Sequence, residues 1–172
     1  MGWIGNAFRG WLGGWLGRIS AALSPNHVRQ QVREAFSARV TGLASTGARV
    51  FQSNQNLSES DLPCLRITTP REVILDDDIL DIPYLQHRTI TLRCQVLVKA
   101  GSGVADILNT ICEEVESAIQ SEPTLGGLSP IHTSLRHYDS TMEGITDRPT
   151  GMATLDFEFV VLTMSNAPSV AL

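Results

Sequence analysis

The chain has 172 residues and a formal net charge of −5, from 13 basic and 18 acidic side chains. This length corresponds to one domain with room for an appendage. A hydrophobic fraction of 42% excludes a disordered chain, and the acidic balance excludes a protein that coats DNA through a basic face.

The first 24 residues are predicted to form a basic helical arm. Residues 1–33 contain four arginines (Arg9, Arg18, Arg29 and Arg33) and no acid, which leaves 9 − 18 = −9 for the remainder. Apolar residues recur every four positions, at 3, 4, 7, 8, 11, 12, 15, 16 and 19, and include all three tryptophans. A period of four predicts an amphipathic helix whose apolar stripe drifts around the axis. Each interposed glycine costs about 1 kcal/mol in a helix interior, so this helix needs a surface to pack on.

Several functions of the arm can be compared. Glycines interrupt the apolar run, which argues against a secretory signal, and only eight residues separate Arg9 from Arg18, which argues against a membrane span. Three alternatives remain: an interfacial membrane helix, an arm packed on its own domain, and an arm docked on a protein partner. The drifting stripe favours the docking arm. Its candidate contact residues are Trp3, Ile4, Phe8, Trp11, Leu12, Trp15 and Leu16.

The segment Ser24-Pro25-Asn26 breaks the chain before the body, and Ser24 or Asn26 is a candidate cap for a helix over 27–42. A short strand over 48–51 and a polar loop over 52–61 follow. Residues 63–69 alternate as a strand, which Pro70 either stops or places at a sheet edge.

The second half of the body contains the clearest strand pattern, over 87–99. A helix over 104–121, a strand over 131–138, a loop over 139–151 and a strand over 152–164 come next, before a loose tail at 165–172. The inward-facing strand residues are Ile90, Leu92, Cys94, Val96, Val98, Ala153, Leu155, Phe157, Phe159 and Val161. This order predicts an α+β domain over residues 25–164, a mostly antiparallel sheet with two helices on one face, preceded by the N-terminal helical arm.

An acidic segment at 72–81 forms a loop or an edge strand. Its clustered carboxylates are Asp76, Asp77, Asp78 and Asp81. A solvated loop explains them, and a metal site is an alternative, although no glycine and no distal glutamate complete a calcium loop. A third interpretation is a surface that repels phosphate, so that nucleic acid passes without sticking.

No motif for catalysis is found: the sequence lacks G-x-S-x-G, H-E-x-x-H and C-x-x-C. The histidines are scattered, and His132 and His137 are expected to point to opposite faces of a strand, which argues against a shared metal. Cys64, Cys94 and Cys112 fit reduced core residues of an intracellular protein. We therefore expect no enzyme and no cofactor.

Several segments together resemble the tail terminator (tail completion, minor tail U-like) proteins of long-tailed bacteriophages. The helix containing Val28–Ala35 leads to Thr46-Gly47-Ala48-Arg49-Val50-Phe51, then to Leu62-Pro63-Cys64-Leu65. After the second helix comes Glu122-Pro123-Thr124-Leu125-Gly126-Gly127-Leu128, and a strand at 153–161 closes the chain. The resemblance covers residues 26–164 and does not include the arm.

The resemblance implies a structural virion protein, assembled in the host cytoplasm, that forms a hexameric ring at the head-proximal end of the tail. Such a ring ends polymerisation of the tail tube protein, offers a surface to a neck or connector protein and lets DNA pass without specific binding. Within it, Asp76–Asp81 is expected near the lumen, and the tryptophans of the arm are expected to contact a tail or neck protein rather than a membrane. A head–tail connector or neck adaptor is the alternative, followed by a membrane-surface binding protein that uses the arm.

Overall fold

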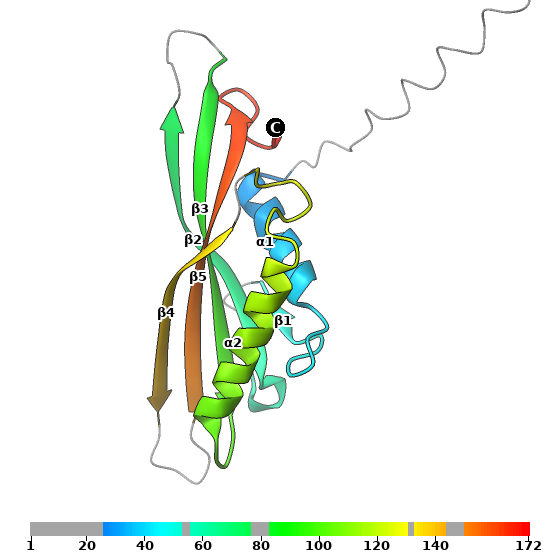
Figure 1. The fold of residues 1–172 in the computed structure, drawn as a ribbon, viewed down its shortest axis with the longest axis vertical. Helices are drawn as coiled ribbons and strands as arrows, with labels where there is room; N and C mark the ends of the chain where they lie inside the picture. Colours follow the sequence, from blue (N-terminus) through cyan, green and yellow to red (C-terminus); the bar gives the residue numbers. More distant parts are fainter. Residues whose placement is uncertain (1–25, 53–55, 77–82, 131–132, 144–149) are drawn as a thin grey trace, which may run out of the picture.

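A computed structural model describes residues 26–52, 56–76, 83–130, 133–143 and 150–172 (Figure 1). The elements are α1 (Val28–Val40), β1 (Val50–Phe51), a 3-10 turn (η2, Glu59–Asp61), β2 (Cys64–Asp76), β3 (Leu85–Lys99), α2 (Val104–Gln120), β4 (Ser134–Glu143) and β5 (Thr150–Met164). The sheet has the order β1-β2-β3-β5-β4, with β1 parallel to β2 and all other pairs antiparallel. Both helices pack on one face of this sheet, which confirms the predicted α+β fold.

The long pair β3–β5 forms the centre of the sheet, with an unbroken register from Leu85–Met164 to Lys99–Thr150. Along β3 every second side chain is buried, because successive side chains of a strand point to opposite faces. The inward residues predicted for both strands are buried against the helices, as expected. The sequence alternation therefore positions the core correctly.

The two helices bury stripes at helical spacing. In α1 the buried apolar residues are Val28, Val32, Phe36 and Val40, one turn apart. Phe36 reaches the middle of the sheet, where its ring lies 5.3 Å from that of Phe157 and 6.2 Å from that of Phe159 between centroids. α2 approaches the sheet closely at Gly151, where an added Cβ would lie 2.8 Å from Leu108 Cδ1 and still closer to Val104. A glycine is thus required where the start of α2 crosses β5.

Two expected boundaries differ from the structure. β2 does not stop at Pro70 but continues to Asp76, with a register shift between Thr68 and Arg71, so of the two alternatives for Pro70 the position at a sheet edge holds. Pro70 is exposed at this bulge, where its lack of a backbone N–H removes no hydrogen bond between β2 and β3. Residues 139–143, predicted to be a loop, are the second half of β4.

The C-terminal tail and the cap of α1 also differ from expectation. Residues 165–172 are not loose: Leu172 N–H donates to Leu162 O, and Pro168 O accepts from Val28 N–H. The helix begins after His27, whose Nδ1 accepts from Arg29 N–H at 3.2 Å, in place of a cap by Asn26. Ser24, the other candidate, lies outside the described residues.

Candidate functional site

Most of the predicted interaction residues lie outside the described part of the chain. This holds for the arm residues Trp3, Ile4, Phe8, Trp11, Leu12, Trp15 and Leu16, and for Asp77, Asp78 and Asp81 of the acidic segment. Asp76 is the last residue of β2, and its backbone pairs with that of Gln86 on β3. The acidic segment therefore begins at the tip of the β2–β3 hairpin, which extends beyond α1 (Figure 1).

Both edges of the sheet carry strand segments with one paired side. On one edge, β4 pairs with β5, and within the described residues no other strand adjoins it. On the other edge, β1 adjoins β2 only at Leu65 and Arg66, so Arg71–Asp76 of β2 pairs with β3 alone in the described chain. Exposed backbone donors and acceptors on such edges are sites for pairing with a further strand.

Large apolar side chains are exposed on both of these edges. Ile74 and Leu75 on β2 are 43% and 60% exposed, and Tyr138 and Met142 on β4 are 44% and 59% exposed. A monomeric protein gains little from exposed side chains of this size at a strand edge, whereas an interface would cover them. The sequence does not reveal Tyr138 and Met142 as neighbours on one strand, because it predicts a loop over residues 139–143.

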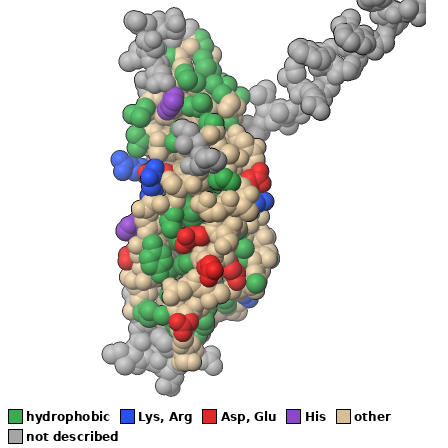
Figure 2. Space-filling model, in the orientation of Figure 1, with side chains coloured by type: hydrophobic (Ala, Val, Ile, Leu, Met, Phe, Trp, Pro, Cys, Tyr) green, Lys and Arg blue, Asp and Glu red, His purple; other side chains and the backbone are tan. Residues whose placement is uncertain are grey.

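A groove lies between α2 and β4. It has a volume of about 570 Å³ and is lined by Tyr138 of β4 and by one polar stripe of α2: Asn109, Cys112, Glu113, Glu116, Ser117 and Gln120. Figure 2 shows this face, where acidic side chains gather over α2 and hydrophobic side chains lie beside them toward β4. No basic residue contributes to the described lining of the groove. It therefore combines an acidic wall on α2 with an opposite wall on β4, where Tyr138 supplies the apolar surface.

The sheet face away from the helices is polar at its centre. Arg93 of β3 makes two parallel hydrogen bonds of 2.8 Å to the carboxylate of Asp156 on β5. This pair raises the pKa of the Arg93 guanidinium further above its ordinary value, chiefly through the hydrogen bond to Asp156. Nearby, Arg136 of β4 pairs with Glu158. The ion pairs tie β4, β5 and β3 together across the open face.

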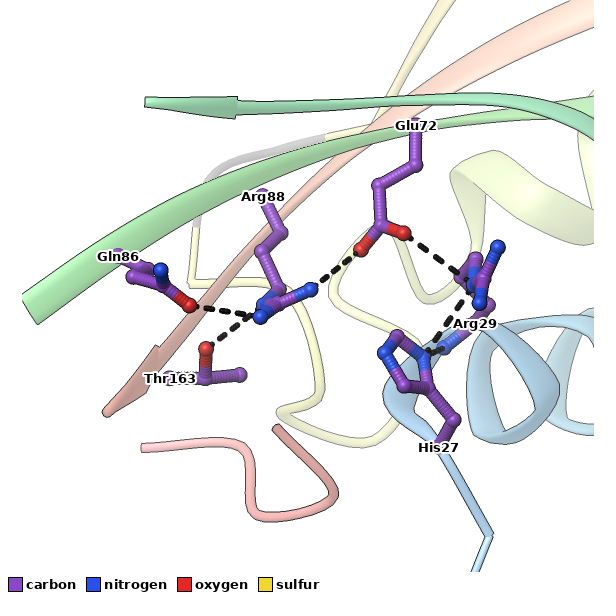
Figure 3. A network of polar contacts seen from close by, with 6 residues as sticks. All are labelled: His27, Arg29, Glu72, Gln86, Arg88 and Thr163. Carbon is purple, nitrogen blue, oxygen red and sulfur yellow. Dashed lines mark hydrogen bonds and ion pairs between the residues drawn. The ribbon is translucent and has the colours of Figure 1, made fainter. Parts of the chain in front are cut away.

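A second polar network is buried on the helix side, where β2, β3, β5 and α1 meet (Figure 3). Arg88 of β3 donates to Glu72 at 2.9 Å, to Gln86 at 2.6 Å and to Thr163 at 2.9 Å. Glu72 also pairs with Arg29 of α1 at 3.2 Å, and its side chain is only 9% exposed. A buried carboxylate shared by two arginines fixes the start of α1 against the extended hairpin.

His27 connects this network to the beginning of the body. Its Nδ1 accepts from the Arg29 backbone N–H and from Arg29 Nε. Burial is the main cause that lowers the pKa of His27, with smaller contributions from the charges of Arg29 and Arg88, while Glu72 acts in the opposite direction. The neutral ring is thus the form that caps α1.

We expect acid to weaken this cap. Because the pKa of His27 is lowered in the folded state, its stabilising contribution is present above the unfolded value near 6.5 and is lost as the pH falls through the folded value. Between pH 7.5 and 5.5 the Tm of the wild type should fall more than that of His27→Asn, which caps without titrating. The control His137→Asn removes an exposed histidine of β4 and should follow the wild type. Equal falls in wild type and His27→Asn would contradict this role of His27.

The three cysteines are free and buried, as predicted. Burial raises the pKa of the Cys94 thiol far above its ordinary value and that of Cys112 to about 11. Thiols held protonated in this way are poor nucleophiles and metal ligands. Among the described residues no group of three His, Cys, Asp or Glu side chains could hold a metal ion, and no described helix is both long and apolar enough to cross a membrane.

Two of the segments that carry the sequence resemblance, residues 46–51 and 122–128, form the turns that follow the two helices. Residues 46–51 lead from α1 into β1, with Gly47 at a φ of 57°. After α2, three successive residues, Leu125, Gly126 and Gly127, have positive φ, and the Leu125 side chain is buried. Thr133 closes this turn through hydrogen bonds to Pro123 O. These segments therefore position the elements of the fold.

Comparison with known proteins yields a structural similarity only. No protein-family model and no curated protein sequence matches the chain. Among solved structures, the fold is similar to a chain of the structure titled "Virion of native gene transfer agent (GTA) particle". The TM-score is 0.42 and the sequence identity is 13%, over 80% of this chain and 92% of that chain.

Proposed function

We propose that the protein is a structural virion subunit, and specifically a tail terminator that forms a ring at the head-proximal end of a phage tail tube. The ring ends polymerisation of the tube, joins the head and lets DNA pass through its lumen. The sequence resemblance over residues 26–164 supports this proposal. The structural observation that carries it is the pair of unlike, open sheet edges.

The two open edges differ in sequence and lie on opposite sides of the sheet. One is β4, and the other is Arg71–Asp76 of β2. Pairing of one edge with the other edge of the next subunit is a heterologous contact, which repeats around an axis and closes into a ring. Strand addition supplies backbone hydrogen bonds, and Ile74 and Leu75, which are exposed on the β2 edge, add buried area.

The acidic segment is proposed to face the lumen of this ring. Asp76 is the last residue of β2, and Asp77, Asp78 and Asp81 follow it in the sequence before β3 begins. A ring of like negative charge repels the phosphates of DNA, so that the nucleic acid slides without binding. Imaging of an assembled ring tests this placement, and acidic segments on the outer rim would contradict it.

Lysines placed on each edge test the ring. Asp139→Lys/Thr141→Lys alters exposed positions of β4 on the face away from the helices, and Ile74→Lys/Leu75→Lys alters the exposed edge of β2. Edge lysines disfavour strand pairing, so each double variant should lose the closed ring. Size-exclusion chromatography with light scattering measures the mass, and circular dichroism confirms that the body stays folded.

Mixing the two variants separates ring-forming contacts from a two-fold dimer. Each variant retains the edge that the other lacks, so an equimolar mixture should form pairs through the one intact interface and no closed ring. The control Glu34→Lys/Glu59→Lys alters exposed carboxylates away from both edges and should assemble like the wild type. A wild type that stays monomeric at all concentrations, or edge variants that keep the ring mass, would contradict the proposed function.

A further inference from the structure

We propose that residues 1–24 of one subunit dock as an amphipathic helix in the groove between α2 and β4 of a second copy of the chain. The tryptophans would face Tyr138 on β4, and Arg9, which lies on the opposite side of the helix, would face the acidic wall on α2. The inference rests on the proposed function for the presence of a neighbouring subunit, and it names that neighbour, rather than a tail or neck protein, as the partner of the arm.

The shape of the groove suits a helix. Its six α2 residues, from Asn109 to Gln120, follow the spacing i, i+3, i+4, i+7, i+8, i+11 and so form one straight stripe. This stripe is about 16 Å long at 1.5 Å per residue, and the predicted helix over 3–19 is about 25 Å long. The arm is therefore long enough to cover the whole groove, in the common mode of an amphipathic helix laid in a groove.

The opposite wall supplies apolar contacts. Tyr138 and Met142 pair with Leu155 and Gly151, which are inward residues of β5, so both side chains lie on the helix side of the sheet. Each is about half exposed in the single chain. Aromatic and methionine side chains are enriched where proteins bind, and tryptophan is the residue that most often anchors such contacts. The arm offers Trp3, Trp11 and Trp15 for this wall.

The charges of the two surfaces are complementary. Glu113 and Glu116 line the groove, and its described lining contains no basic residue. The arm carries Arg9 and Arg18 and no acid. Opposite charges on arm and groove steer association and fix its orientation. A neutral or acidic apolar helix would match the groove less well.

The start of the body favours docking on a second copy over docking on the same chain. Gln31 Nε2 donates at 2.7 Å both to Asn26 O and to Ser169 O, which fixes the end of the arm beside the C-terminal segment. In Figure 1, α2 lies between α1 and β4, so the arm of the same chain would have to cross α2 to enter the groove. With a helix over 3–19, residues 20–25 span at most about 20 Å. A neighbour's groove imposes no such crossing.

The arm contains every tryptophan of the chain, so tryptophan emission reports on the arm alone. The experiment uses two full-length variants: Arg9→Glu/Arg18→Glu reverses the arm, and Glu113→Arg/Glu116→Arg reverses the groove. Each variant alone brings like charges together. Each should show red-shifted emission and self-association weakened by roughly tenfold or more, measured by fluorescence and light scattering during dilution.

An equimolar mixture of the two variants decides the partner. If the arm docks on a second copy, each arm in the mixture finds an oppositely charged groove on the other variant, so the blue-shifted emission and the association return. A chain carrying all four substitutions should also recover both. The control Glu34→Lys/Glu59→Lys should behave like the wild type, because these exposed carboxylates lie outside the groove.

Two other outcomes would overturn the inference. Recovery in the four-substitution chain but not in the mixture would mean that the arm docks on its own subunit. Emission equal to that of the wild type in both variants would mean that the arm does not use this groove, as would be expected if a tail or neck protein or a membrane holds it. If the variants keep the ring and their tryptophan emission is unchanged, only the docking of the arm is refuted. If the wild type forms no ring, the proposed function is refuted.

Discussion

Replacing Phe36 by alanine is expected to lower the free energy of unfolding by about 3–5 kcal/mol, the usual cost of removing a buried phenylalanine. Phe36 is fully buried and is the only aromatic residue of α1. It lies against Phe157 and Phe159 in tilted and edge-to-face contacts. Such contacts contribute about 0.5–1.5 kcal/mol of stability beyond that from the burial of apolar area. The cavity would open where helix and sheet meet, and rigid strands on one side cannot collapse into it.

Urea denaturation followed by far-ultraviolet circular dichroism measures this effect. Tryptophan fluorescence is unsuitable, because no tryptophan lies in the body. The control Phe36→Leu keeps much of the volume and should cost roughly 1.5 kcal/mol or less. A loss under about 1 kcal/mol for Phe36→Ala would show that α1 contributes little to the core.

Replacing Arg88 by methionine is expected to cost about 3–5 kcal/mol, because it breaks a buried ion pair and leaves charge behind. The Arg88 and Glu72 side chains are only 6% and 9% exposed. After the substitution Glu72 keeps Arg29, whose side chain is half exposed, and Gln86 and Thr163 each lose a hydrogen bond. Uncompensated polar groups in a buried site make this loss larger than a surface ion pair would suggest.

A double-mutant cycle separates the pair from its surroundings. Glu72→Met/Arg88→Met removes both charges and should be less destabilised than the sum of the two single variants, by about 1–3 kcal/mol. The same denaturation experiment measures all four proteins. If the single and double variants add without coupling, or if Arg88→Met costs less than about 1 kcal/mol, Arg88 and Glu72 do not act as a buried pair.

The sequence predicts the core well and the edges poorly, for one physical reason. Core strands such as β3 alternate because one face is buried, and that alternation is visible in residues 87–99. β4 carries the polar run Asp139-Ser140-Thr141, since an exposed edge strand needs no apolar pattern. The sequence leaves two alternatives for Pro70, a strand end or a position at a sheet edge, and it does not reveal the bulge between Thr68 and Arg71 that makes the second one possible.

The buried network could have been found in part from the same alternation. Extending the inward positions of β3 backward from Ile90 places Arg88 and Gln86 on the core side. A charged residue at an inward position requires a buried partner. Nothing in the sequence indicates that this partner is Glu72, because the pairing of β2 with β3 depends on the bulge between Thr68 and Arg71. The groove could not be predicted either, since it requires β4 to be a strand.

The central pairing of β3 with β5 has a consequence for the order in which the protein is made. β3 is complete at residue 99, but its partner on one side is not synthesised until residues 150–164. Synthesis runs from the N-terminal side, so the tryptophan-bearing arm precedes β3, and β3 remains without this neighbour while residues 100–149 are made. The centre of the sheet and the groove between α2 and β4 cannot be completed until β5 has left the ribosome. Each newly made chain therefore presents its arm before its own groove exists.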